Sequence, residues 1–185
     1  MTRLLMSLAL LWLLLGCQPA AQSATPAASS STPATQSSTL HTLTIYGYNY
    51  TNRYIDQFYV SGEGGGNMDV STPSAGGSKR TCCMGWRDGT KLPLTLTVRW
   101  VAGGCMRTVT NSVGESRDVP RHIFKEESAT LRGPLPAEPG YLEVHIYPDE
   151  HVEIAITATP SEPRLKLDPA RAVDPYPEKC KATEK

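Results

Sequence analysis

The sequence lacks an excess of charge of either sign: 18 lysines and arginines balance 18 aspartates and glutamates. Nucleic-acid binding requires a clustered basic surface that neutralises phosphates, so nucleic acid is not an expected partner. A single apolar run exceeds ten residues, which excludes a polytopic membrane protein. No apolar pattern with a period of 3.6 residues persists over a long stretch, so the helical fold classes are excluded as well.

Motifs that position catalytic groups are also missing. The chain contains neither a Gly-x-Ser-x-Gly turn for a nucleophilic serine nor a His-Glu-x-x-His zinc motif. The glycine-rich segment 62–67 is not followed by the Gly-Lys-Ser/Thr sequence of a phosphate-binding loop, and we interpret it as a mobile or tightly turned loop. We therefore expect no catalytic residues, no metal and no cofactor.

What the sequence does contain begins with an export signal. Arg3 provides a positive charge, and Leu4–Gly16 is apolar except for Ser7. As a helix this run would be about 20 Å long, shorter than the hydrocarbon core of a membrane, so residues 1–16 are predicted to form a secretory signal peptide. The segment Leu14-Leu15-Gly16-Cys17 resembles the bacterial lipobox, in which the cysteine is lipidated and becomes the first mature residue. A plain signal peptide with an incidental cysteine is the alternative.

The residues after Cys17 indicate where the anchored protein is sorted. Gln18 stands where an aspartate would mark retention in the inner membrane, so the resemblance implies the outer membrane with the domain on its periplasmic face. Several acyl chains on one cysteine make a stable membrane anchor. The rest of the segment 17–40 is uncharged and rich in Ala, Ser, Thr, Pro and Gln, a composition typical of a flexible tether.

Residues 41–160 carry the patterns of a folded domain. Apolar and polar residues alternate in several segments, which predicts strands. The clearest segments are 92–100, 43–50, 55–61, 141–147 and 152–156, with weaker ones at 107–110 and 116–119. Only 124–131 has a composition that tolerates one or two helical turns. Because Gly and Pro recur about every ten residues, we expect an all-β fold, a single antiparallel β-sandwich or barrel-like domain.

The segment Pro148–Glu150 separates two of these strands and predicts a hairpin with a three-residue loop. In that register His145 lies opposite Glu153 and His151 opposite Tyr147, on the polar face of the hairpin. Solvated cross-strand charge pairs are the common interpretation of such a face. A metal site formed by these side chains with Glu143 is the alternative.

Four further cysteines indicate disulfides, because the predicted compartment is oxidising. Adjacent cysteines rarely bond to each other, so we expect one of Cys82 and Cys83 to pair with Cys105 and the other with Cys180. Either arrangement would attach the proline-rich C-terminal tail, residues 161–185, to the sheet. A zinc site and a redox-active pair are the alternatives.

Several segments resemble a family of bacterial lipoproteins described as domain of unknown function 3304. The resemblance is carried by Ile45–Ile55, Val60–Asn67, Cys82–Trp86, Val98–Trp100 and Val144–Asp149, and spans roughly residues 43–158. No catalytic residues are established for that family, so the resemblance implies none here.

The resemblance also implies a context for function. Such lipoproteins are often encoded beside antibacterial lipase effectors of type VI secretion systems, where a periplasmic lipoprotein acts as the immunity protein. The leading hypothesis is a non-catalytic lipoprotein that binds and neutralises a secreted phospholipase, with the membrane and this toxin as partners. The alternatives are a structural or accessory outer-membrane lipoprotein without a toxin partner, and a small enzyme or metal-binding protein. The sequence assigns no oligomeric state.

Aromatic residues commonly carry the binding energy of protein interfaces, although half of the aromatics in any strand belong to the core. The aromatic residues and the glycine-rich segment are therefore the predicted contacts for a partner. They are Tyr46, Tyr48, Tyr50, Tyr54, Phe58, Tyr59, Gly64, Gly65, Gly66 and Asn67.

Overall fold

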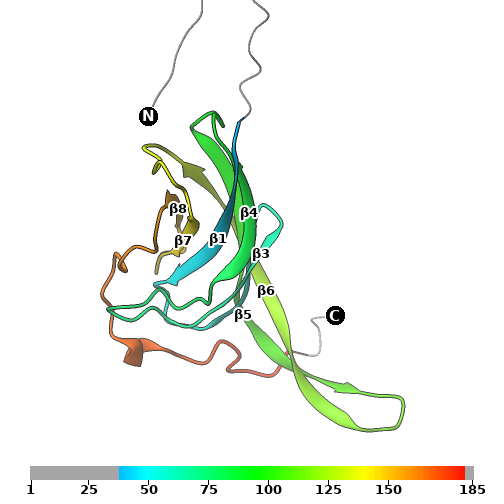
Figure 1. Ribbon diagram of the computed structural model, residues 1–185. Helices are drawn as coiled ribbons and strands as arrows, with labels where there is room; N and C mark the ends of the chain where they lie inside the picture. Colours follow the sequence, from blue (N-terminus) through cyan, green and yellow to red (C-terminus); the bar gives the residue numbers. More distant parts are fainter. Residues whose placement is uncertain (1–37, 182–185) are drawn as a thin grey trace, which may run out of the picture. The chain divides into compact units, whose positions relative to one another are not determined.

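The computed structural model describes residues 38–181, in which eight strands form two four-stranded sheets (Figure 1). The strands are β1 (Leu40–Asn49), β2 (Ile55–Val60), β3 (Glu63–Met68), β4 (Thr81–Arg87), β5 (Leu94–Thr110), β6 (Ser116–Leu131), β7 (Tyr141–Ile146) and β8 (Val152–Thr157). Their order is β4-β1-β7-β8 in one sheet and β3-β2-β5-β6 in the other. The expected all-β sandwich is confirmed. One detail differs, because β1 and β7 are parallel and the first sheet is therefore mixed.

The core lies between the two sheets and follows from the alternation in the sequence. Leu43 and Ile45 of β1 are fully buried against Val98 of β5 and its neighbours, and every second residue of β7 and β8 joins the same cluster. Each large aliphatic side chain buried in this way contributes about 1.5–3 kcal/mol to folding. The polar residues between them point to the two outer faces of the sandwich.

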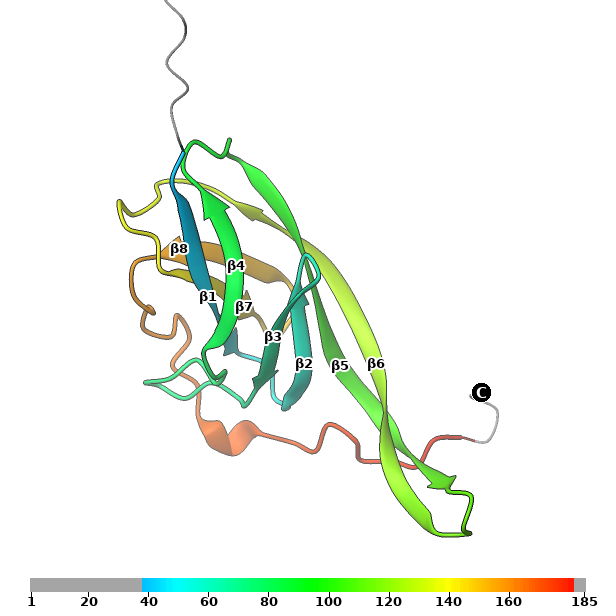
Figure 2. The same cartoon turned by 45° about the vertical axis from the view of Figure 1, so that its right-hand side comes forward.

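The strands β5 and β6 form one long hairpin, paired from Leu94 with Leu131 to Thr110 with Ser116. Its first half belongs to the sandwich, whereas its second half extends beyond the other strands (Figure 2). The weaker strand candidates 107–110 and 116–119 are confirmed in this second half. The expectation of helical turns at 124–131 is wrong, because this segment pairs with β5 and places Ala129 and Leu131 in the core.

The glycine-rich segment is not a loop between strands. Residues 63–68 form the edge strand β3, which pairs with β2. A Cβ atom on Gly65 would lie 2.1 Å from carbons of the Phe58 ring, so the missing side chain is what lets β3 approach this aromatic residue. The prediction was wrong because the sequence pattern does not reveal this close contact.

Residues 161–181, called the tail from here on, are irregular except for the 3-10 helix η1 (Pro169–Arg171). The tail passes over the first sheet and continues to the long hairpin (Figure 1). On the way, Arg171 donates to the carbonyl oxygens of Thr51, Ser71 and Asn49. Nowhere in residues 38–181 is there a helix of the length and apolarity that a membrane crossing requires. The predicted signal peptide, Cys17 and most of the tether lie outside the described residues.

The cysteine pairing differs from the predicted one. Cys105 is joined to Cys180, and Cys82 is joined to its neighbour Cys83. Met106 exchanges backbone hydrogen bonds with Glu178 and Cys180, and this strand-like contact brings the last two cysteines beside each other. Cys82 and Cys83 lie on β4, at the edge of the opposite sheet. The prediction failed because the distance between the two sheets is not visible in the spacing of the cysteines.

Candidate functional site

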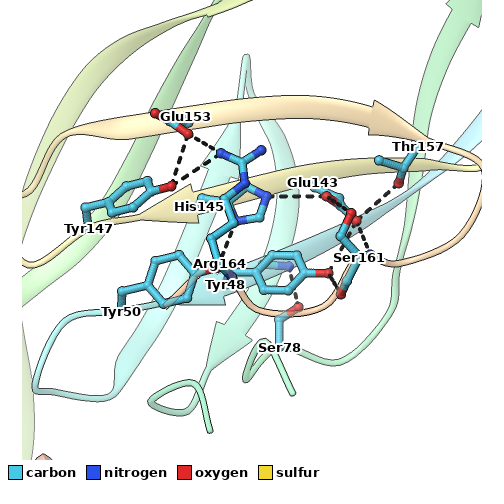
Figure 3. Close-up of polar contacts among 11 residues, drawn as sticks. Tyr48, Tyr50, Ser78, Glu143, His145, Tyr147, Glu153, Thr157, Ser161 and Arg164 are labelled. Carbon is cyan, nitrogen blue, oxygen red and sulfur yellow. Dashed lines mark hydrogen bonds and ion pairs between the residues drawn. The ribbon is translucent and has the colours of Figure 1, made fainter. Parts of the chain in front are cut away.

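A buried polar cluster lies on the outer face of the first sheet. Tyr48 comes from β1, Tyr50 directly follows that strand, and Glu143 and His145 come from β7; all four residues are at most 1% exposed. The parallel register places Tyr48 directly beside His145, and their rings stack with centroids 4.2 Å apart. Figure 3 shows the polar contacts that join these residues to Ser161 of the tail. We define the buried polar cluster as Tyr48, Tyr50, Glu143 and His145 together with Ser161, an exposed tail residue that contacts Tyr48 and Glu143.

Glu143 is the centre of this cluster. One of its oxygens accepts hydrogen bonds from the Ser161 amide at 2.6 Å and the Thr157 hydroxyl at 3.2 Å. The other accepts from the Ser161 hydroxyl at 3.0 Å and lies 3.3 Å from Nε2 of His145. A buried carboxylate is tolerated only where its lone pairs are satisfied in this way. The Tyr48 hydroxyl also lies 3.3 Å from this carboxylate, and two of the five groups that contact it belong to the tail, so the carboxylate attaches the tail to the sheet.

The hydrogen bonds around His145 have one consistent direction. The Glu143 carboxylate beside Nε2 can only accept, so Nδ1 of His145 accepts from the Tyr50 hydroxyl, 3.1 Å away, while the Arg164 amide donates to the Tyr50 oxygen at 2.7 Å. The proton of the neutral imidazole is then on Nε2, facing Glu143. The Tyr48 hydroxyl donates to the Ser161 carbonyl at 2.6 Å. Both tyrosines therefore also bind backbone groups of the tail.

Burial and these hydrogen bonds set the protonation states. Burial alone would raise the pKa of Glu143, but the hydrogen bonds from His145 and Ser161 outweigh it and hold the pKa below its ordinary value. Burial lowers the pKa of His145, and its contact with Glu143 only partly opposes this. Burial also raises the pKa of Tyr48 and Tyr50. At neutral pH the cluster therefore contains one carboxylate, a neutral imidazole and two neutral phenols.

Serine, histidine and glutamate occur together in many hydrolases, but their arrangement here differs from a catalytic one. A nucleophilic serine needs its hydroxyl hydrogen-bonded to the imidazole that removes its proton. Here the Ser161 hydroxyl is bonded to Glu143, and Nδ1 of His145 is occupied by Tyr50. The geometry is that of a structural attachment between the tail and the sheet.

The predicted register of the β7–β8 hairpin is confirmed. His145 pairs with Glu153, and the rings of Tyr147 and His151 stack with centroids 4.1 Å apart. The interpretation of the whole face as solvated is wrong for His145, because the tail covers it. His151 and Glu153 remain exposed. Within residues 38–181, no three or more His, Cys, Asp or Glu side chains are arranged to hold a metal ion, so the alternative metal site is not formed there.

In the structure, some of the residues predicted to contact a partner are buried and others are exposed. Tyr48, Tyr50 and Phe58 are fully buried and Gly65 is also buried, so for these four the prediction of a surface contact is wrong. The tail covers the two tyrosines, and Phe58 belongs to the hydrophobic core between the sheets. Tyr46 and Tyr54 are partly exposed and stay predictions, as do the exposed residues Gly64, Gly66 and Asn67. Tyr46 lies in the first sheet and the exposed glycine-rich residues lie in the second.

The tail reaches the outer face of the second sheet only near the projecting part of the hairpin, where the Tyr176 ring stacks on His122, and it leaves an accessible patch uncovered. Tyr59 of β2 is paired with Arg99 of β5, and the Arg99 guanidinium lies 3.8 Å from the centroid of the Phe124 ring on β6. The Tyr59 and Phe124 rings are 6.5 Å apart. Across the part of the chain that the structure describes, no carboxylate is within 4 Å of this guanidinium. We call Tyr59, Arg99 and Phe124 the aromatic–arginine patch.

Sequence reasoning identified two parts of this patch without joining them. The alternation in 92–100 placed Arg99 on the polar face, and Tyr59 was among the predicted contacts. Phe124 was assigned to a helical turn, so its position beside Arg99 was missed. The long register of β5 with β6, which no local pattern reveals, brings these two residues together.

Comparison with known proteins identifies the family. A family model described as "Protein of unknown function (DUF3304)" matches residues 48–154, more than half of the chain. The chain belongs to this family. The DUF3304 match includes Tyr48, Tyr50, Glu143 and His145 of the buried polar cluster and the whole aromatic–arginine patch, but it ends before Ser161 and the tail. Neither a curated protein nor a solved structure matches the chain.

Proposed function

We propose that this DUF3304 protein is a lipid-anchored, periplasm-facing binding protein that neutralises a secreted phospholipase, and that it is not an enzyme. The observation that supports this best is the aromatic–arginine patch. Arginine and tyrosine are the residue types enriched at the energetic centres of protein interfaces. Here they lie on a sheet whose backbone is fixed by pairing on both sides of β5, so the partner meets a surface that is already ordered.

The charge of Arg99 specifies what the partner must supply. Its guanidinium stacks on Phe124, which leaves its N–H groups available for a bidentate carboxylate. Covering the patch would exclude water from this ion pair and strengthen it. We therefore expect the phospholipase to present an aspartate or glutamate to Arg99 and an apolar surface to Tyr59.

The N-terminal features support the same proposal. Lipidation at Cys17 would hold the domain close to the membrane that a phospholipase attacks. A protein confined in this way meets its target at a raised effective concentration, so a moderate affinity is sufficient for protection. Replacing Cys17 with Ser should release the protein from membranes; membrane association of that variant would contradict the proposed anchor.

The decisive experiment measures binding to the product of the adjacent gene. The chain from Gln18 to Lys185 is titrated with that protein in a calorimeter, and its lipase activity is assayed in parallel. We expect one-to-one binding that abolishes the activity. Arg99→Ala should weaken binding by about 2 kcal/mol, roughly 30-fold. Arg132→Ala, which removes another exposed arginine outside the patch, should leave the affinity unchanged.

Each outcome decides between defined alternatives. Absence of binding by the folded, oxidised chain would overturn the immunity role and favour an accessory lipoprotein of the envelope. Tight binding that both arginine variants retain would keep the immunity role but place the contact away from the aromatic–arginine patch.

A further inference from the structure

The second half of the β5–β6 hairpin extends away from the sandwich, and most of its residues are exposed (Figures 1 and 2). The turn at its end is well ordered, because the Asn111 side chain accepts hydrogen bonds from the amides of Val113 and Glu115. Val113 is 76% exposed at this turn. A projecting hairpin with an ordered turn is a preformed element for binding a partner.

The base of the projecting hairpin is held on one side by the tail. The Cys105–Cys180 disulfide and the backbone hydrogen bonds of Met106 with Glu178 and Cys180 add a third, strand-like segment beside β5. Lys179 of the tail also pairs with Asp118 of β6. These contacts fix the orientation of the hairpin relative to the second sheet.

The two faces of the hairpin differ in chemistry. Residues opposite each other in an antiparallel pair share a face, so Arg107 lies beside Val119, and Val109 lies beside Arg117. We call these four residues the arginine–valine face. Towards the base, Arg121 and the 56% exposed Ile123 continue it, because they alternate in phase with Val119 on β6. The opposite face carries Thr108, Thr110, Ser116 and Asp118.

The charges follow the same division. Within residues 38–181, no carboxylate lies within 4 Å of the guanidinium groups of Arg107 and Arg117. The carboxylate of Asp118 is on the other face, bound by Lys179 and Thr108. Glu115 at the turn accepts a hydrogen bond from Asn111. The arginine–valine face therefore presents positive charge alternating with aliphatic side chains.

We propose that the arginine–valine face lies on a membrane surface that contains anionic phospholipids. Arginines bind the phosphate groups of lipids, and the valines and Ile123 enter the interface between headgroups and acyl chains. A protein partner is the less suitable occupant, because this face carries no aromatic anchor. The aromatic residues of the patch are on other faces: Phe124 alternates with Ile123 on β6 and points to the opposite side. The bound hairpin would thus leave the aromatic–arginine patch accessible to the phospholipase.

This inference rests on the lipid anchor of the proposed function, since a single small face binds membranes weakly by itself. Each arginine near an anionic surface strengthens binding about fivefold. The anchor would raise the local concentration of lipid enough for this weak contact to be occupied. The consequence is a fixed orientation of the domain on the membrane.

The test measures partitioning of the unlipidated chain, Gln18 to Lys185, onto vesicles at low ionic strength. One set contains phosphatidylcholine alone and the other equal parts of phosphatidylcholine and phosphatidylglycerol. We expect binding to the anionic vesicles only. Arg107→Glu with Arg117→Glu should lower the partition coefficient about 25-fold or more. The matched control, Arg87→Glu with Arg132→Glu, changes the net charge equally at exposed positions outside the hairpin and should lower it less than about threefold.

Circular dichroism and the urea midpoint verify that both variants are folded. Equal partitioning onto the two kinds of vesicle, or an equal loss in the two variants, would overturn the inference. Loss of phospholipase binding in Arg107→Glu with Arg117→Glu, with unchanged vesicle binding, would overturn it in favour of a protein partner. The assay contains no effector and does not use Cys17, so its failure leaves the immunity role untouched. Vesicle binding without effector binding would refute the immunity role alone.

Discussion

The two outer faces of the sandwich are built from strands with the same alternating pattern, but their environments differ. On the sheet that contains β1 and β7, the side chains of Glu143 and His145 are completely buried. On the sheet that contains β2, β5 and β6, Arg99 is exposed beside the half-buried Tyr59 and Phe124. The difference comes from the tail, which covers Glu143 and His145 but touches the second face only where the Tyr176 ring stacks on His122. Whether a polar strand face is buried or exposed therefore depends on a segment that is distant in the sequence.

The largest expected change in stability comes from removing the disulfide that attaches the tail to the second sheet. Replacing Cys105 and Cys180 together with Ser removes a link between residues 75 positions apart and should lower the free energy of unfolding by about 4 kcal/mol. The measurement is urea denaturation of the oxidised proteins. The same replacement at Cys82 and Cys83 should cost much less, because a link between neighbours restricts the unfolded chain little. Equal losses would show that the tail disulfide does not restrain the fold in this way.

The second prediction compares one glutamate from each face. Glu143→Ala leaves four buried or partly buried donors without their acceptor and should lower the free energy of unfolding by about 3 kcal/mol or more. Glu126→Ala, on the open face, should change it by less than about 0.5 kcal/mol. Denaturant titrations of both variants at pH 7 test this. A small loss for Glu143→Ala would mean that the tail does not depend on this carboxylate.

The third prediction concerns pH and is smaller, because mild acid removes only part of the same interactions. The folded pKa values of His145 and Glu143 both lie below their ordinary values of 6.5 and 4.5. The unfolded chain therefore binds protons at a higher pH than the folded one, and stability falls as the pH decreases. The loss begins below about pH 6.5 with His145 and grows below about pH 4.5 with Glu143.

Unfolding free energies measured between pH 7 and pH 4 test this sign. Replacing His145 with Gln should flatten the upper part of the profile. Stability that rises on acidification would contradict the assignment of a neutral His145 and an ionised Glu143.

The smallest effect compares two tyrosine hydroxyls. Tyr50→Phe removes the acceptor of the Arg164 amide and the partner of His145 Nδ1, and should lower the free energy of unfolding by about 1–2 kcal/mol. Tyr59→Phe loses only a contact with Gln57 and should change it by less than about 0.5 kcal/mol. Thermal unfolding of the two variants measures the difference. Similar losses of unfolding free energy in the two variants would show that the face covered by the tail and the exposed face of the second sheet do not differ in this way.

Local pattern was sufficient for much of the fold. The strands around Ile45, Val98 and Ile154 were predicted because alternation with period two is a property of the nearest residues. The three-residue loop Pro148–Glu150 similarly fixed the register that pairs His145 with Glu153. The segment 124–131 was missed, since its many polar residues are tolerated in a strand only by virtue of its pairing with β5.

The candidate sites were predicted less completely, because they depend on contacts between residues that are distant in the sequence. Glu143 and His145 were placed correctly on one face, but their burial depends on Ser161 and Arg164, which follow in an irregular segment. Arg107 and Arg117 form a face only through the long hairpin register. Hydrogen bonds and pairings between distant residues have no local periodicity, so no window of sequence contains them.

The sequence by itself determined the class of the fold, the faces of most strands and the family, because each depends on neighbouring residues. The tertiary structure alone decided which cysteines meet, which polar face is buried and which side chains share a face with Arg107 and Arg117. Those outcomes depend on where the tail passes over the sandwich and on how far β5 and β6 remain paired. Both are set by the summed energy of many contacts between distant residues, which local composition does not encode.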